Sequence, residues 1–153
     1  MRISENCSII QVPAVDINGA GIASNYINME EGKDLTILIN AGVMGAASAV
    51  TLLQATDNAG TSAKALSYTG SYATTYSATV TSQVDVPAYT AGALTIAATG
   101  DNKCYLIELD ASELDVSNGF SHVKLVAADP EVASVVGAEL ILTKKRSVDA
   151  SAK

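Results

Sequence analysis

The chain has 153 residues, of which 48% are hydrophobic and only 16% are charged, and its formal net charge is −7 at pH 7. This length is typical of one domain and is enough to bury a core without help from a disulfide or a metal ion. The acidic balance argues against a general nucleic-acid binder, which needs a basic face to displace counterions from phosphate.

The first residues contain one apolar run that a proline ends. Residues 7–12 read as a strand, and Pro13 would place it at a sheet edge because proline cannot donate to a β-ladder. We therefore expect residues 1–16 to form an N-terminal arm or edge strand. The opening sequence lacks the layout of a signal peptide, and no apolar run reaches the roughly 18 residues of a membrane span. These features predict a protein made in the cytoplasm, with no membrane partner.

The clearest pair of strands lies in residues 34–57, DLTILINAGVMGAASAVTLLQATD. Apolar and β-branched residues alternate on both sides of residues 41–47, a connection that contains two glycines. The pattern predicts a β-hairpin with apolar residues on both faces, which is typical of a central, buried strand pair. The small connection is predicted to touch a neighbouring subunit through Val43 and Met44.

The remaining apolar segments extend the same pattern. Alternation with period two predicts a long strand over residues 72–86 with one wet face, and further strands lie within 94–96, 103–109, 120–127 and 135–143. The whole chain then holds about eight to ten strands, with turns about every ten residues and no helix longer than a turn. We expect an all-β fold: a single antiparallel β-sandwich or jelly-roll-like domain over residues 17–143, with short flexible termini.

Two segments outside the strands carry local signals. Asp110 is followed three residues later by Glu113, the pattern of a capping box, so residues 110–115 are predicted to form one helical turn that Asn118 and Gly119 end. Residues 144–153 form a basic tail without apolar pattern, predicted to leave the domain. Its three consecutive basic residues could grip an acidic partner surface: Lys144, Lys145 and Arg146.

Residue types that carry chemistry do not form a recognisable site. Cys7 and Cys104 lie far apart and outside any CxxC pattern, which favours two buried free thiols over a zinc or redox site. His122 is the only histidine and reads as a half-exposed strand residue, although an enzyme using it remains a third hypothesis. Four carboxylates lie within residues 108–115, but their spacing does not match a calcium loop, and a turn capped by Asp110, with Asp115 bonding nearby backbone, fits better. We predict no catalytic, cofactor or metal site.

Tyrosines offer one binding hypothesis from another class of protein. Tyr68, Tyr72 and Tyr76 are spaced at four, and residues four apart on a strand share one face. They could stack on sugars in a carbohydrate-binding β-sandwich module, although the chain has no tryptophan. Core or subunit-interface tyrosines are the alternative interpretation.

Two blocks of sequence resemble the small virion structural proteins of tailed bacteriophages, in particular the head decoration, or cement, type. The first block comprises residues 26–37 (YINMEEGKDLTI) and 49–61 (AVTLLQATDNAGT). The second comprises residues 105–109 (YLIEL) and 114–123 (LDVSNGFSHV). The resemblance covers roughly residues 20 to 143, and its motifs are soft patterns.

The resemblance implies a non-enzymatic protein, a single β-sandwich that binds the outer capsid surface and holds neighbouring subunits of the major capsid protein together. It also implies a homotrimer, a location on the virion, no cofactor and no direct contact with nucleic acid. A phage tail or head–tail connector component is the nearest alternative. A chain of low charge, rich in threonine and alanine, suits a protein whose stability comes from large shared interfaces.

Overall fold

The structure, a computed structural model, describes residues 6–30, 32–67, 73–74, 85–86, 93–99 and 101–144. Six longer strands form its frame: β1 (Cys7–Asp16), β4 (Gly32–Met44), β5 (Ser48–Ala55), β10 (Lys103–Asp110), β11 (His122–Ala127) and β12 (Ser134–Lys144). The shorter elements are β2 (Ile22–Ala23), β3 (Ile27–Asn28), β6 (Lys64–Ala65), β7 (Ala73–Thr74), β8 (Asp85–Val86), β9 (Ala93–Ile96) and two 3-10 helices, η1 (Ala111–Glu113) and η2 (Val116–Asn118).

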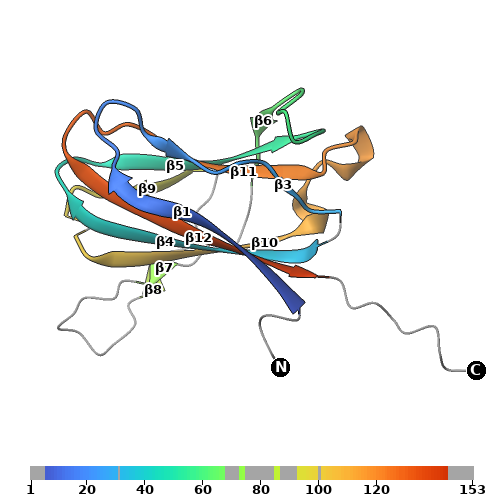
Figure 1. The fold of residues 1–153 in the computed structure, drawn as a ribbon, viewed down its shortest axis with the longest axis horizontal. Coiled ribbons are helices and arrows are strands. Elements are labelled where there is room, and N and C mark those ends of the chain that lie inside the picture. The colour runs from blue at the N-terminus through green and yellow to red at the C-terminus, as the bar shows by residue number, and fades with distance from the viewer. Residues whose placement is uncertain are drawn as a thin grey trace, which may run out of the picture.

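The strands form two antiparallel sheets that face each other. Sheet A has the order β1-β12-β4-β10. Sheet B has the order β2-β11-β5-β6, with β3 added beside β11 and β9 beside β5. Figure 1 shows them as two layers, with sheet A below sheet B. The prediction of an all-β antiparallel sandwich without longer helices is confirmed for the described residues, whereas the jelly-roll variant stays a prediction.

The predicted hairpin of residues 34–57 is wrong, because its two strands belong to different sheets. β4 pairs with β10 and β12, while β5 pairs with β11, β6 and β9. β4 also continues to Met44, so the connection shortens to residues 45–47, which cross from sheet A to sheet B. Gly45 begins the crossing, where its N–H donates to the carbonyl of Ala133, at 3.2 Å, and to Ser134 Oγ, at 3.0 Å.

The hydrophobic core lies between the sheets. Leu35, Ile37 and Ile39 of β4 and Val50 and Leu52 of β5 have no exposed surface and belong to one cluster. Removal of this apolar surface from water is the main force that holds the sheets together. The intervening side chains of both strands point outward and are only partly buried. The prediction that both faces of this strand pair are buried is therefore wrong.

Residues 7–16 form β1, one of the two edge strands of sheet A. β1 pairs with β12 from Cys7 to Asp16, with one irregularity, where Pro13 and Ala14 together oppose Gly137. A bulge of this kind kinks the strand and locally interrupts the ladder, which resumes at Val15. Gly137 fits there because a Cβ on it would come within 2.7 Å of the backbone of Ala14. The segment therefore belongs to the sandwich instead of extending from it as a separate arm.

The long strand predicted over residues 72–86 is not one strand. Ala73 and Thr74 of β7 pair antiparallel with Val86 and Asp85 of β8, so the two ends of the predicted strand lie against each other. The rest of that segment lies outside the described residues. β7 also packs against β10, beside sheet A (Figure 1). The alternation could not show where the chain reverses.

Candidate functional site

One end of the sandwich is closed by the two 3-10 turns that follow β10. Asp110 Oδ1 accepts a hydrogen bond from the N–H of Ser112 at 2.8 Å, and the N–H of Asp110 donates to Glu113 Oε2 at 2.9 Å. This is the capping box that the sequence predicts. The bonds from Ser112 hold the pKa of the Asp110 carboxyl below its usual value. Gly119 ends the second turn at a φ of 81°, as predicted for the turn pair.

Asp115 ties these turns to sheet B. Its carboxylate accepts hydrogen bonds from the Nζ of Lys64, from Asn118 Nδ2 at 2.8 Å and from Ser117 Oγ at 3.1 Å. The partner side chains, above all Lys64, lower the pKa of Asp115 from 3.8 to about 2. Its backbone N–H donates to the Oε1 of the buried Gln54 at 2.9 Å. The prediction that the Asp115 carboxylate bonds nearby backbone is wrong, since its recorded partners are side chains.

Replacing Asp115 with asparagine is expected to lower thermal stability at neutral pH but not in acid. Because the folded-state pKa of about 2 lies below the usual 3.8, the carboxylate stabilises the fold above about pH 4, and this contribution is lost as the pH falls towards 2. Melting temperatures of the wild type and the D115N variant should therefore differ at pH 7 and converge near pH 2. The exposed Glu108→Gln is the control; a difference that persists in acid would contradict the electrostatic explanation.

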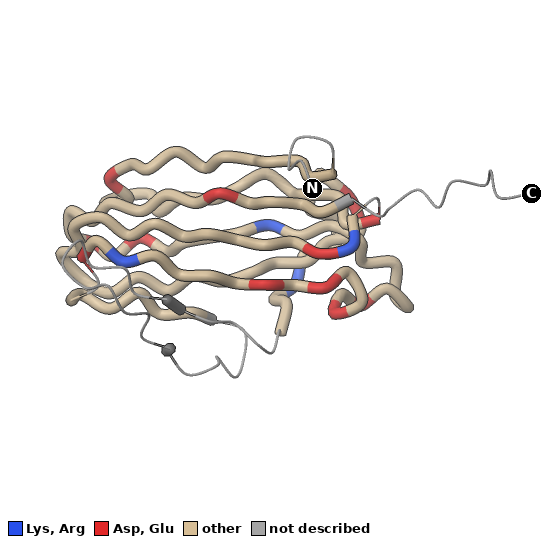
Figure 2. The backbone as a smooth tube through the Cα atoms, turned by 90° about the horizontal axis from the view of Figure 1, so that it is seen from below, with Lys and Arg blue, Asp and Glu red and all other residues tan. Residues whose placement is uncertain are grey.

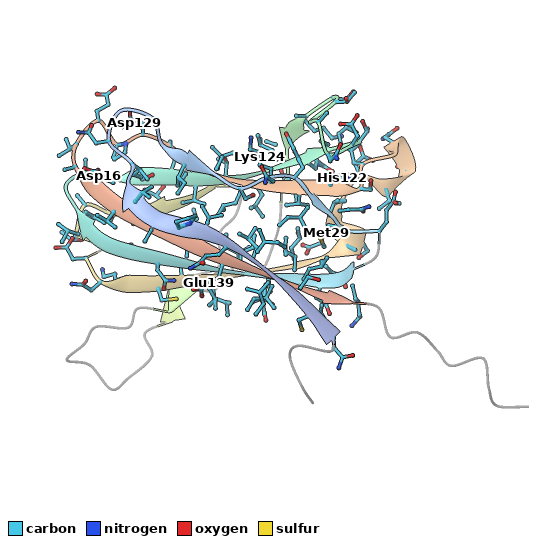
Figure 3. The ribbon with its side chains drawn as sticks, in the orientation of Figure 1. Asp16, Met29, His122, Lys124, Asp129 and Glu139 are labelled. Atoms are coloured by element: carbon cyan, nitrogen blue, oxygen red, sulfur yellow. The ribbon has the colours of Figure 1, made fainter. Side chains whose placement is uncertain are left out.

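A pocket lies beside these turns, at the end of the sandwich. Its volume is about 560 Å³. Met29, Leu114 and Phe120 are buried residues of its wall, and Val116, 61% exposed, lies at its mouth. Figure 3 shows Met29 between the two layers. The rest of the lining consists of Ala111, Gly119 and five polar residues: Glu30, Lys33, Asp110, Ser112 and Ser121. Such a mixture can hold an apolar group beside a polar one but shows no arrangement of ligands for a metal ion.

His122 lies at the beginning of β11 near this pocket, although the pocket lining does not include it. Its Nδ1 is 2.9 Å from Ser121 Oγ, and its side chain is half-buried, as the sequence predicts. It pairs across the sheet with Asn28 and Ala55. Ser121 lines the pocket and His122 does not. Figure 3 shows His122 on the layer that sheet B forms. This arrangement gives the enzyme hypothesis no further support.

The cysteines are free but not fully buried. Cys7 and Cys104 are both half-buried, which corrects the prediction of buried thiols. Burial, followed by the nearby charge of Glu139, raises the pKa of the Cys104 thiol. Within the described part of the chain no three metal-ligating side chains gather.

The outer face of sheet A presents apolar side chains to solvent. Leu38 of β4 lies opposite Leu106 of β10 and Glu139 of β12, and in the next row Ile141 of β12 lies opposite Ile9 of β1. Ile9 is 60% exposed, and the two leucines and Ile141 are half-buried. Figure 2 looks onto this face and shows few charged residues along its strands, most of them acidic. We call the four apolar residues, Ile9, Leu38, Leu106 and Ile141, the apolar stripe.

The predicted contact residues are only partly placed by the structure. Val43 is 64% exposed at the end of β4, as a surface contact requires. Met44 is 4% exposed and packs into the core, so its side chain is not a surface contact, which corrects the prediction. Alternation explains the difference, because neighbours on a strand face opposite ways. Lys144 is the last residue of β12, and the others lie outside the described residues: Tyr68, Tyr72, Tyr76, Lys145 and Arg146.

The apolar stripe was not predicted from the sequence. The alternation in the sequence places Leu38 and Leu106 on the opposite face of their strands from the main apolar set. The pattern was interpreted as burial of both faces of these strands. Two features of the sequence could have predicted the stripe. Leu38 and Leu106 lie on the strand face opposite the apolar inward residues, and Pro13 marks an edge strand of the sheet. The cross-strand rows that join them depend on pairings between distant segments.

Comparisons with known proteins show no family for this chain. No protein-family model matches the sequence, and no curated protein matches it. Among solved structures, one similar chain is titled "Structure of infectious bursal disease virus Gt strain". It is 11% identical, the similarity covers 92% of this chain and 43% of that one, and the TM-score is 0.24. A likeness this weak carries no argument about fold or function. In the part of the chain that the structure describes, no helix has the length and hydropathy to cross a bilayer.

Proposed function

We propose that this chain is a non-enzymatic structural protein of a bacteriophage virion, a decoration protein that binds the outer surface of the head. There it stabilises contacts between subunits of the major capsid protein. The observation that carries the proposal is the apolar stripe on the outer face of sheet A, an extended surface without clustered chemical groups. The stripe is the surface that docks on the shell.

The chemistry of this face defines its partner. Protein interfaces combine an apolar centre with a polar rim. Here Leu38 and Leu106 provide the centre, while Glu108 and Glu139 lie in the same rows of the sheet as the stripe. The matching surface on the shell is therefore apolar at its centre and carries basic groups around it, which pair with these carboxylates and orient the docking.

Binding to stripped heads tests this proposal. Heads prepared without the protein should bind the purified wild-type chain and then resist heat and osmotic shock better than bare heads. The Leu38→Lys variant, with a charge at the centre of the stripe, should bind about tenfold more weakly or worse. Val116→Lys, which places the same charge at an exposed apolar residue beside the pocket and outside the stripe, is the control and should bind like the wild type.

Three results would contradict the proposal. Bare heads could withstand heat and osmotic shock as well as complete ones, which would exclude a cement role. Leu38→Lys could bind as tightly as Val116→Lys while retaining the wild-type melting temperature, which would exclude the stripe. Gold-labelled protein could decorate tails or the head–tail junction in micrographs, which would favour a tail or connector component instead.

A further inference from the structure

The edges of the two sheets differ in how they are protected from pairing with another strand. Sheet B ends in short pieces: β2 and β3 on one side, β6 and β9 on the other. The β10 edge of sheet A carries Lys103, Glu108 and Asp110, and β7 packs against it. Short strands, charges and covering segments are the devices by which natural proteins block edge-to-edge association.

The β1 edge is protected along only half of its length. Pro13 and the bulge opposite Gly137 interrupt the second half of the strand. The first half, Cys7 to Val12, contains no charged residue and no proline, and it pairs with β12 in unbroken register. Among the described residues no strand lies on its other side. It therefore presents a regular row of backbone donors and acceptors that another strand can use.

We propose that the β1 edge binds the β1 edge of a second copy of this chain, forming an antiparallel pair about a two-fold axis at Ile9. Residues directly opposite each other in an antiparallel pair point to the same side of the sheet. The cores of both copies therefore lie on the same side only if one residue of β1 lies opposite the same residue of the second copy. With Ile9 on the axis, Cys7 faces Gln11 and Ser8 faces Ile10. The ladder between the two copies then runs from Cys7 to Gln11 and ends before Pro13.

Side chains on the outer face favour this occupant over an unrelated strand. Ile9, 60% exposed, would meet its own copy, and Ile141 lies beside Ile9 on the neighbouring strand. The row then reads Ile141, Ile9, Ile9, Ile141 across the two copies, a continuous set of cross-strand apolar pairs.

Charge also favours the second copy at this edge. Each chain carries a net charge of −7, so two copies repel one another over most of their surfaces. The first half of β1 has no charged residue, and repulsion there is smallest. The inference does not depend on the proposed role in the virion, because it concerns the purified chain alone.

Sedimentation equilibrium on the purified full chain tests the proposal. The wild type should have the mass of a dimer, and Ile9→Lys should weaken association by about tenfold or more, because it places two like charges together on the axis. Val116→Lys, which alters an apolar residue of matching exposure, should remain a dimer. A monomer or trimer mass for the wild type, or equal association of both lysine variants, would overturn the proposal.

Disulfide trapping tests the register independently of stability. Residues directly opposite in an antiparallel pair have Cα atoms about 4.5–5.5 Å apart, within the range of a disulfide. In a Cys7→Ser, Cys104→Ser background, Ile9→Cys should therefore form a covalent dimer rapidly under mild oxidation. Val116→Cys in the same background should not do so. Failure of the Ile9→Cys variant to cross-link faster than this control would exclude the two-fold axis at Ile9.

Discussion

Replacing Ile37 with alanine is expected to lower the free energy of unfolding by about 2–5 kcal/mol. Ile37 lies in the middle of β4, has no exposed surface and belongs to the core between the sheets. Alanine would remove most of that side chain and leave a cavity that the flanking strands cannot close, because both β12 and β10 are hydrogen-bonded to β4 at this point. Equilibrium denaturation in urea measures the loss.

The neighbouring Leu38→Ala is the matched control. Leu38 points to the outer face of sheet A and is half-buried, so its truncation removes less buried surface and creates no enclosed cavity. We expect it to cost no more than about 1 kcal/mol. Equal losses at Ile37 and Leu38 would mean that both faces of β4 are buried, as the sequence pattern suggested, and would contradict the assignment of an open outer face.

The sequence allowed the strands to be predicted better than their partners. Alternation with period two located β4, β5, β10, β11 and β12, because an apolar inward face leaves that pattern in any sheet. The same pattern is produced whether consecutive strands pair side by side or face each other across the core. A short, glycine-containing connection therefore suggested a hairpin, where β4 and β5 in fact lie in opposite sheets.

Local parts of the candidate site were predictable and distant ones were not. The capping box of Asp110 and Glu113 lies within four residues, and the turn at Gly119 depends on its own backbone. The contacts of Asp115 with Lys64 and Gln54 join residues 51 and 61 positions apart. Only the pairing of sheet B brings them together, and no spacing rule in the sequence expresses it.

The surfaces proposed for binding also combine local features, which the sequence predicts, with features that depend on pairing between distant segments. Pro13 marked β1 as an edge from sequence alone, and the structure adds the bulge that leaves its first half open. Val43 was predicted on the expectation of a loop, but it is exposed because it occupies an outward position at the end of β4. The apolar stripe depends on cross-strand neighbours in β1, β12, β4 and β10. These strands come from distant parts of the sequence, so their order in the sheet could not be predicted from it.

Replacing Phe120 with alanine is expected to lower the free energy of unfolding by about 3 kcal/mol. The ring is 7% exposed, and the Lys64 ammonium lies 4.1 Å from its centroid. A value at the lower end of the range for phenylalanine is expected because one side of the ring already borders the open pocket. Val116→Ala, across the same pocket, should change stability by less than about 0.5 kcal/mol.

A double-mutant cycle separates packing from the electrostatic connection at this end of the sandwich. Phe120 positions Lys64, and Lys64 donates to Asp115, so loss of the ring should leave the ion pair less ordered. The D115N substitution should therefore cost less in the Phe120→Ala background than in the wild type. Strictly additive losses would mean that Lys64 reaches Asp115 without the ring. A smaller combined loss would identify Phe120 as the residue that couples the 3-10 turns to sheet B.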